Sequence, residues 1–143
     1  MTAATKNRNT PTRESTRRGY LAAAAIHVYA GVIVALNAGG FAQPGATATG
    51  LRAVGAAVRE IDNTDGADGA QIVEVDRGIF RFNNSAGADA IAATDIGKQC
   101  YIVDDTTVAL TDGTGTRSSA GVIDGVDDDG VWVSIDPSHG ALA

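Results

Sequence analysis

The residues that could carry catalytic or metal chemistry are few in this chain. Two histidines are present, His27 inside an apolar stretch and His139 near the C-terminal end, and Cys100 is the single cysteine. No His-x-His or Glu-x-x-His spacing provides a zinc ligand set, and one cysteine cannot complete a thiolate site. No Gly-x-Ser-x-Gly turn supports a serine nucleophile. The sequence therefore predicts no catalytic residue, no metal site and no cofactor, and indicates that the protein is not an enzyme.

Two acidic runs raise the question of calcium. Residues 62–68 (DNTDGAD) bring side-chain oxygens close together, and residues 127–129 (DDD) form a second run. The first run lacks both the ligand order of an EF-hand loop and its closing Glu. Asp and Asn are typical of turns, where their side chains accept hydrogen bonds from the backbone. We therefore interpret both runs as solvated turns.

Trp132 is the only tryptophan in a chain with three Phe and three Tyr. It lies in the last apolar segment of the sequence, 131–135. A tryptophan in such a strand-like segment is typical of a core or interface anchor. The alternative is that the indole stacks on a ligand, and Tyr29 and Tyr101 are the other aromatic side chains that such a site could use.

Charge divides the chain after residue 18. Residues 1–18 hold five basic side chains and one acid, a net charge of +4, whereas the rest holds six bases and 16 acids, a net charge of −10. A polar segment of this kind cannot bury enough apolar surface to fold alone, so it is either disordered or bound to a partner. Arginines suit bidentate pairing with carboxylates on a partner surface. The candidate contact residues are Arg8, Arg13, Arg17 and Arg18.

The overall charge and hydropathy exclude two classes of partner. A net charge of −6 argues against a body that binds nucleic acid, although the basic arm alone could touch phosphate. The one long apolar stretch, 20–36, is rich in Ala and is interrupted by His27 and Gly31, so it falls short of a membrane span. We expect neither a membrane nor a direct nucleic-acid partner.

After the arm, short β-prone runs alternate with turns. Residues 72–82 show the clearest period of two, and Gly78 is expected to introduce a bulge there. Residues 51–61 have a helical composition, but Gly55 and the flanking glycines favour a strand. Asp-Gly at 129–130 predicts a hairpin turn. Further strands are expected at 26–36 with a corner at Gly31, and at 99–103, 106–110, 119–126 and 131–135.

Roughly seven to nine short strands, about 8–12 residues apart, predict an all-β protein. The expected fold is a single jelly-roll-like β-sandwich or small barrel with an extended N-terminal arm. No repeat with a period of about 20–50 residues is visible. The predicted organisation is an extended basic arm at 1–18, a β domain at 19–136 and a C-terminal tail at 137–143.

Five segments between Gly19 and Ile135 carry a family resemblance. They are GYLAAAAIHVYAGVIVALNAGG, LRAVGAAVREIDN, VEVDRGIFRF, DIGKQCYIVDDTTVA and AGVIDGVDDDGVWVSI. In this order they resemble the head decoration (cement) proteins of tailed bacteriophages, with the best match to the Bordetella-phage-type cement protein. The most specific parts are 97–109 and 130–133.

The resemblance implies a structural role in a virion, assembled in the host cytoplasm. A decoration protein sits on the outer capsid surface, bridges neighbouring major capsid proteins and forms a homo-oligomer, for which we favour a dimer over a trimer. The family has no catalytic residues to carry over, and the assignment of the arm arginines to capsid contacts is our own inference from charge. The alternative function is a glycan-binding or adhesive β-sandwich on a virion surface.

Overall fold

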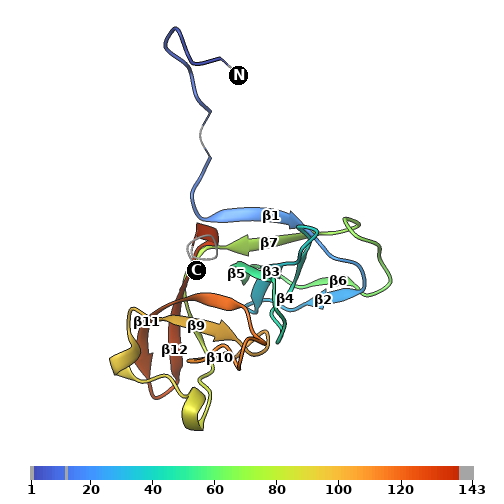
Figure 1. Ribbon diagram of the computed structural model, residues 1–143. Coiled ribbons are helices and arrows are strands. Elements are labelled where there is room, and N and C mark those ends of the chain that lie inside the picture. Colours follow the sequence, from blue (N-terminus) through green and yellow to red (C-terminus); the bar gives the residue numbers. More distant parts are fainter. Residues whose placement is uncertain (1, 12, 139–143) are drawn as a thin grey trace.

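The computed structural model of the chain describes residues 2–11 and 13–138 and shows an all-β protein, as predicted (Figure 1). Its strands are β1 (Arg17–Leu21), β2 (Ile26–Val28), β3 (Ile33–Leu36), β4 (Ala42–Pro44), β5 (Arg52–Ala57), β6 (Ile61–Asn63), β7 (Ile72–Asp76), β8 (Gly78–Phe82), β9 (Gln99–Ile102), β10 (Val108–Ala109), β11 (Ser119–Asp127) and β12 (Gly130–Ile135). Two single 3-10 turns, η1 (Gly87–Asp89) and η2 (Ala93–Asp95), lie between β8 and β9.

Ten of these strands form two five-stranded antiparallel sheets. Their orders are β1-β7-β5-β3-β4 and β10-β9-β11-β12-β8, and β2 pairs with β6 in a separate ribbon. Each large sheet closes on itself, because an isolated parallel bridge joins Ala22 to Ala42 in the first and Asn83 to Thr107 in the second. We call them the first barrel and the second barrel. The finer prediction of a jelly roll is not established by this strand order.

The two barrels have the same topology. Numbered along the chain, the five strands of each barrel are arranged in the sheet as first, fifth, fourth, second and third. Both barrels also have a register shift between their second and fourth strands. The register pair Val34–Gly55 in the first barrel corresponds to Cys100–Gly121 in the second, 66 positions later. The chain therefore contains one barrel plan twice.

The connecting loops support the same correspondence. In each barrel the hairpin between the second and third strands contains a corresponding backbone hydrogen bond. These bonds run from Asn37 N to Phe41 O and from Val103 N to Thr107 O, again 66 positions apart. Between residues 33–58 and 99–124, the only identical pair at this shift is Gly55 and Gly121. The repeat lies in the backbone, which is why the sequence did not show it.

Two hydrophobic cores account for the small branched side chains of the composition. One lies inside the first barrel and contains Ala22, Val28, Val32, Val34, Ala42, Val54, Ala57, Val73 and Val75. The other fills the second barrel and includes four side chains from the outer surface of the first. These four are Ile33, Ala35, Ala53 and Ala56. Strands β3 and β5 are therefore buried on both faces, which requires small residues there.

The period-two run at 72–82 belongs to both barrels. Instead of one strand with a bulge, the structure has β7 in the first barrel and β8 in the second, with Arg77 between them. Gly78 has φ +151°, a conformation that side chains rarely adopt. Residues 51–61 contain the strand β5 and the first residue of β6 instead of a helix, so the preference for strand is confirmed, with a break at 58–60. The structure also contains the short strand β4, which is not among the predicted strands.

Candidate functional site

The N-terminal arm extends away from the two barrels (Figure 1). Its described residues before β1 are all exposed. Arg8 and Arg13 lie on this arm, and no ion pair joins either of them to another described residue. These two predicted contact residues are therefore available to a partner. Arg17 and Arg18, by contrast, lie within β1.

The arm is anchored to the first barrel through Glu14 and Thr16. The Glu14 carboxylate accepts hydrogen bonds from Thr16 N at 3.1 Å, from Thr16 Oγ1 at 2.7 Å and from Arg17 N. All of these bonds lower the pKa of Glu14, and the bond from the Thr16 hydroxyl has the largest effect. Thr16 O in turn accepts a 2.8 Å bond from Arg77 N. The free part of the arm therefore ends at residue 13.

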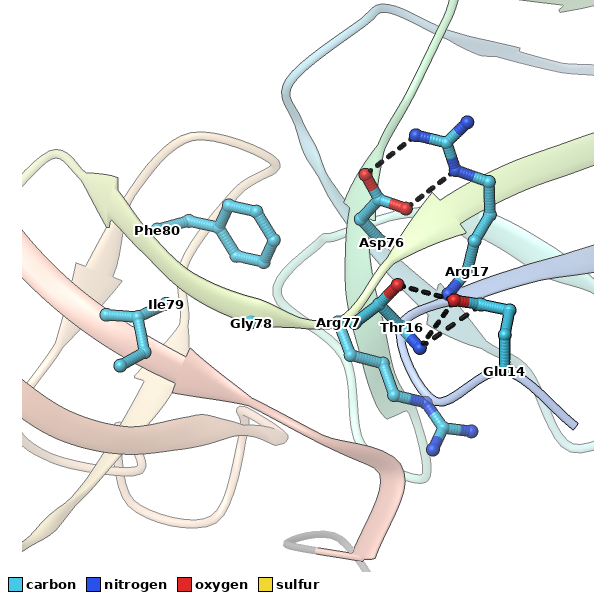
Figure 2. A pocket seen from close by; sticks show the side chains of 8 residues that line it. All are labelled: Glu14, Thr16, Arg17, Asp76, Arg77, Gly78, Ile79 and Phe80. Atoms are coloured by element: carbon cyan, nitrogen blue, oxygen red, sulfur yellow. Dashed lines mark hydrogen bonds and ion pairs between the residues drawn. The ribbon is translucent and has the colours of Figure 1, made fainter.

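Arg17 and Arg18 already bind groups of their own chain. The Arg17 guanidinium donates to both carboxylate oxygens of Asp76, with Nε–Oδ1 at 2.8 Å and Nη2–Oδ2 at 3.1 Å (Figure 2). The hydrogen bond from Arg17 lowers the pKa of Asp76. Arg18 Nη1 donates to the carbonyl oxygens of Glu14 and Arg17. Arg17 thus ties β1 to β7, whereas Arg18 binds only the adjoining segment of the arm and β1.

A groove runs between the two barrels, from the base of the arm to Trp132. We call it the inter-barrel groove. It consists of two adjoining hollows that share Asp76, Ile79 and Phe80 as lining residues. Glu14, Thr16, Arg17, Arg77 and Gly78 complete the end near the arm (Figure 2), and Gly31, Ala56, Ala57, Arg81 and Trp132 complete the other end. The base of the arm and the exposed tryptophan thus border adjoining hollows.

Trp132 is a surface residue, so the prediction of a core anchor is wrong. Its side chain is 37% exposed. The indole Nε1 donates a 2.8 Å hydrogen bond to Asp127 Oδ2, and Arg81 Cζ lies 5.6 Å from the ring centroid. Inward-facing Val131 and Val133 fill the core on either side of it in β12. The role of Trp132 as an interface anchor stays a prediction.

The duplicated barrel shows that the fold does not need tryptophan at this position. Ala57 pairs with Val75 as Ile123 pairs with Val133, so Glu74 is the residue of the first barrel that corresponds to Trp132. Glu74 forms a 2.8 Å ion pair with Arg59. One strand position therefore carries an ordinary surface ion pair in one barrel and an exposed indole in the other.

Asp62 and Asp127 accept hydrogen bonds from the backbone of their own turns, as the turn interpretation predicts, and Asp68 accepts one from a distant loop. Asp127 Oδ1 accepts hydrogen bonds from Asp129 N and Gly130 N. Asp62 accepts one from Thr64 N, and Asp68 accepts one from Ala24 N. Within residues 2–11 and 13–138, no three His, Cys, Asp or Glu side chains are arranged to hold a metal ion.

His27 lies between two carboxylates on the β2–β6 ribbon. Its Nε2 is 3.5 Å from Glu60 Oε1, without hydrogen-bond geometry, and its Nδ1 is 3.9 Å from Asp62 Oδ1. The imidazole stacks on Tyr29, which is 56% exposed. Neither end of the inter-barrel groove includes this group. His139 lies outside the described residues, as does most of the predicted tail.

Cys100 is fully buried inside the second barrel, as a small apolar side chain would be. Burial raises the pKa of its thiol to about 12. Since the thiolate is the nucleophile, this cysteine is unreactive at neutral pH.

Comparisons with known proteins leave the family open. No family model, curated protein or solved structure matches this chain. The resemblance to phage decoration proteins therefore stays a prediction from the sequence. In the described part of the chain, no helix has the length and apolar character that crossing a membrane requires.

Most of the residues that line the groove were not predicted from the sequence. Arg81 and Ile79 alternate with Phe80 and Phe82, so the period of two already placed both on a solvent-facing side. Their proximity to Trp132 depends on the register of β8 with β12, in which Trp132 lies opposite Arg81. No local pattern in the sequence specifies that register.

Proposed function

We propose that this chain is a non-enzymatic capsid decoration (cement) protein. It binds the outer surface of a phage head and bridges neighbouring major capsid proteins. The observation that supports this most strongly is an exposed basic arm on an acidic body made of two barrels. The major capsid protein is the partner that we propose for the arm, on the basis of the sequence resemblance.

The arm contributes through many weak contacts. Lys6, Arg8 and Arg13 are exposed on its free part, and each ion pair with a capsid carboxylate is worth only about 0.2–1 kcal/mol. The body tethers the arm near the shell, so these contacts act together at a high effective concentration. Repetition over many copies, in a homo-oligomer that we propose to be a dimer, then stabilises the expanded shell.

The proposal is tested by adding the purified protein to undecorated capsids and measuring how tightly it binds and how well it protects them against heat. A chain without residues 1–13 keeps Glu14, Thr16 and β1, and so its barrels remain intact. We expect it to bind undecorated heads at least tenfold more weakly than the full chain, and to protect them less against heat. The double variant Arg8→Gln/Arg13→Gln should weaken binding in the same direction, whereas Thr5→Ala/Thr10→Ala should not. Equal decoration by the truncated and complete chains would refute the role of the arm.

Glycan binding is the second candidate function. Tyr29 is 56% exposed and stacks on His27, whose ring nitrogens lie near the carboxylates of Glu60 and Asp62. An exposed aromatic ring with acceptor groups in its surroundings suits a sugar ring. A glycan array with the native chain and with Tyr29→Ala tests it. Binding that disappears in this variant while the fold is retained would favour glycan recognition.

A further inference from the structure

The second barrel closes through Asn83, just after β8, so the edge of β8 itself stays open along the inter-barrel groove. Strand β8 is the last strand in the sheet order of the second barrel and pairs only with β12 there. Consecutive residues of a strand point to opposite faces, yet both Ile79 and Phe80 line the groove (Figure 2). The groove therefore follows the edge of the strand. Among the described residues, backbone bonds beyond that edge begin at Asn83, whose N donates to Thr106 O at 2.8 Å.

An open edge of this kind is a template for an added strand. Its unpaired N–H and C=O groups can bond to an extended segment of another protein. The two ends of the groove are open hollows with volumes of about 640 and 420 Å³. Volumes of this size accommodate several side chains rather than a single ion.

The charges in the groove favour an acidic occupant. Both carboxylate oxygens of Asp76 are taken by Arg17, and those of Glu14 are taken by Thr16 and the Arg17 backbone. No ion pair joins Arg77 to another described residue, and its buried Nε lacks a hydrogen-bond partner within the described part of the chain. Arg81 lies over the Trp132 ring, with Nη1 3.8 Å from Asp129.

The outer face beside the groove offers an apolar contact between these arginines. Ile79 is 50% exposed and Trp132 is 37% exposed. The register of β8 with β12 pairs Ile79 with Ser134 and Arg81 with Trp132, so all four side chains share one face. Tryptophan and arginine are among the residues enriched at the centres of binding interfaces.

We propose that the inter-barrel groove binds an extended acidic segment of a partner protein, which adds as a strand along β8. Its carboxylates pair with Arg77 and Arg81, and an apolar side chain packs on Ile79 and Trp132. This goes beyond the decoration role, because it assigns a partner chemistry to a surface apart from the free arm. The basic arm of a second copy is the wrong occupant, since it would meet Arg77 and Arg81.

Trp132 reports on its own surroundings, because it is the only tryptophan in the chain. The probe is an end-blocked peptide of three Glu-Leu repeats, titrated into the full-length protein while the indole emission is recorded. We expect a saturable shift in the emission of Trp132. The affinity obtained from this titration should fall as salt is added. The matched Gln-Leu peptide should bind at least about fivefold more weakly, because it cannot form charge-assisted hydrogen bonds.

Variants locate the binding and separate it from the function of the arm. Arg77→Gln and Arg81→Gln should each weaken binding of the Glu-Leu peptide about fivefold or more. Lys98→Gln removes one positive charge outside the groove and should leave the affinity unchanged, as should deletion of residues 1–13. Three results would overturn the proposal: no emission shift at millimolar peptide, equal binding of the Gln-Leu peptide, or preferential binding of a peptide with the sequence of residues 2–13.

Discussion

The orientation of the exposed Trp132 side chain is fixed by contacts with its neighbours on the surface. The Asp127 carboxylate fixes the indole N–H, the Arg81 guanidinium lies over the ring, and Gly125 leaves room beneath it on the adjacent strand. An exposed aromatic side chain with this much support loses little entropy when a partner covers it. The arrangement is therefore suited to binding and contributes little to folding.

Substitution at Trp132 should separate stability from binding. We expect Trp132→Ala to lower the free energy of unfolding by only about 1 kcal/mol, since it loses one hydrogen bond and a partly exposed contact. Ile102→Ala, inside the second barrel at 0% exposure, should cost about 2–5 kcal/mol. Urea unfolding followed by circular dichroism measures both. A loss for Trp132→Ala as large as that for Ile102→Ala would mean that the indole is structural.

At the scale of single elements, a glycine fixes the irregularity that both barrels share. Gly55 and Gly121 occupy corresponding positions in β5 and β11. A Cβ at Gly55 would lie 2.1 Å from Asp76 O, and one at Gly121 would lie 2.2 Å from Ser134 O. In both barrels, therefore, the fourth and fifth strands approach each other too closely for any side chain at this position.

We expect Gly55→Ala and Gly121→Ala each to destabilise the protein by about 1–3 kcal/mol through this clash. Gly55→Ala should cost more, because Gly55 also has φ +148°. Gly125→Ala is the matched control on β11, since its Cβ would meet the Trp132 ring at an ordinary 3.7 Å. Thermal unfolding of the three variants checks the order. An unchanged Tm for Gly121→Ala would show that the two barrels do not share this constraint.

Strand β1 should loosen in acid. The Arg17 guanidinium lowers the pKa of Asp76 below its ordinary value of 3.8. A lowered folded pKa means that the pair stabilises the protein above pH 3.8 and that this contribution is lost as the pH falls further. Hydrogen exchange of the β1 amides, corrected for intrinsic rates, should show protection decreasing below about pH 4. In Arg17→Gln this decrease should be smaller, while β11 behaves as in the native chain. Identical profiles in both proteins would contradict the role of the pair.

The sequence could predict those elements that are determined by residues close together in the chain. It could not predict contacts that depend on the pairing of distant strands. Period-two patterns and turn residues located β7, β8, β11 and β12, and the charge of the arm was visible in its composition. The engagement of Arg17 was not, because its partner Asp76 lies 59 positions away and is reached only through the register of β1 with β7. The exposure of Trp132 likewise depends on which face of β12 turns inward. Local patterns thus predict strands and leave their pairing undetermined.

At the scale of the whole molecule, the second core joins the two barrels into one folding unit. Four side chains from the outside of the first barrel are buried with the interior of the second, among them Ile33 and Ala56. If either barrel stood alone, these four apolar side chains or the core that they complete would be exposed to water. The duplication therefore does not produce two independent domains, since β3 and β5 serve both cores.

Unfolding should accordingly be a single transition. Trp132 emission reports on the second barrel and circular dichroism on both, and we expect their urea curves to coincide. Val34→Ala, which removes volume inside the first barrel at 0% exposure, should move both midpoints down together, by about 1–3 kcal/mol in stability. Thr10→Ala on the arm should move neither. If Val34→Ala shifted the dichroism and left the Trp132 midpoint unchanged, the barrels would unfold separately and the shared core would not couple them.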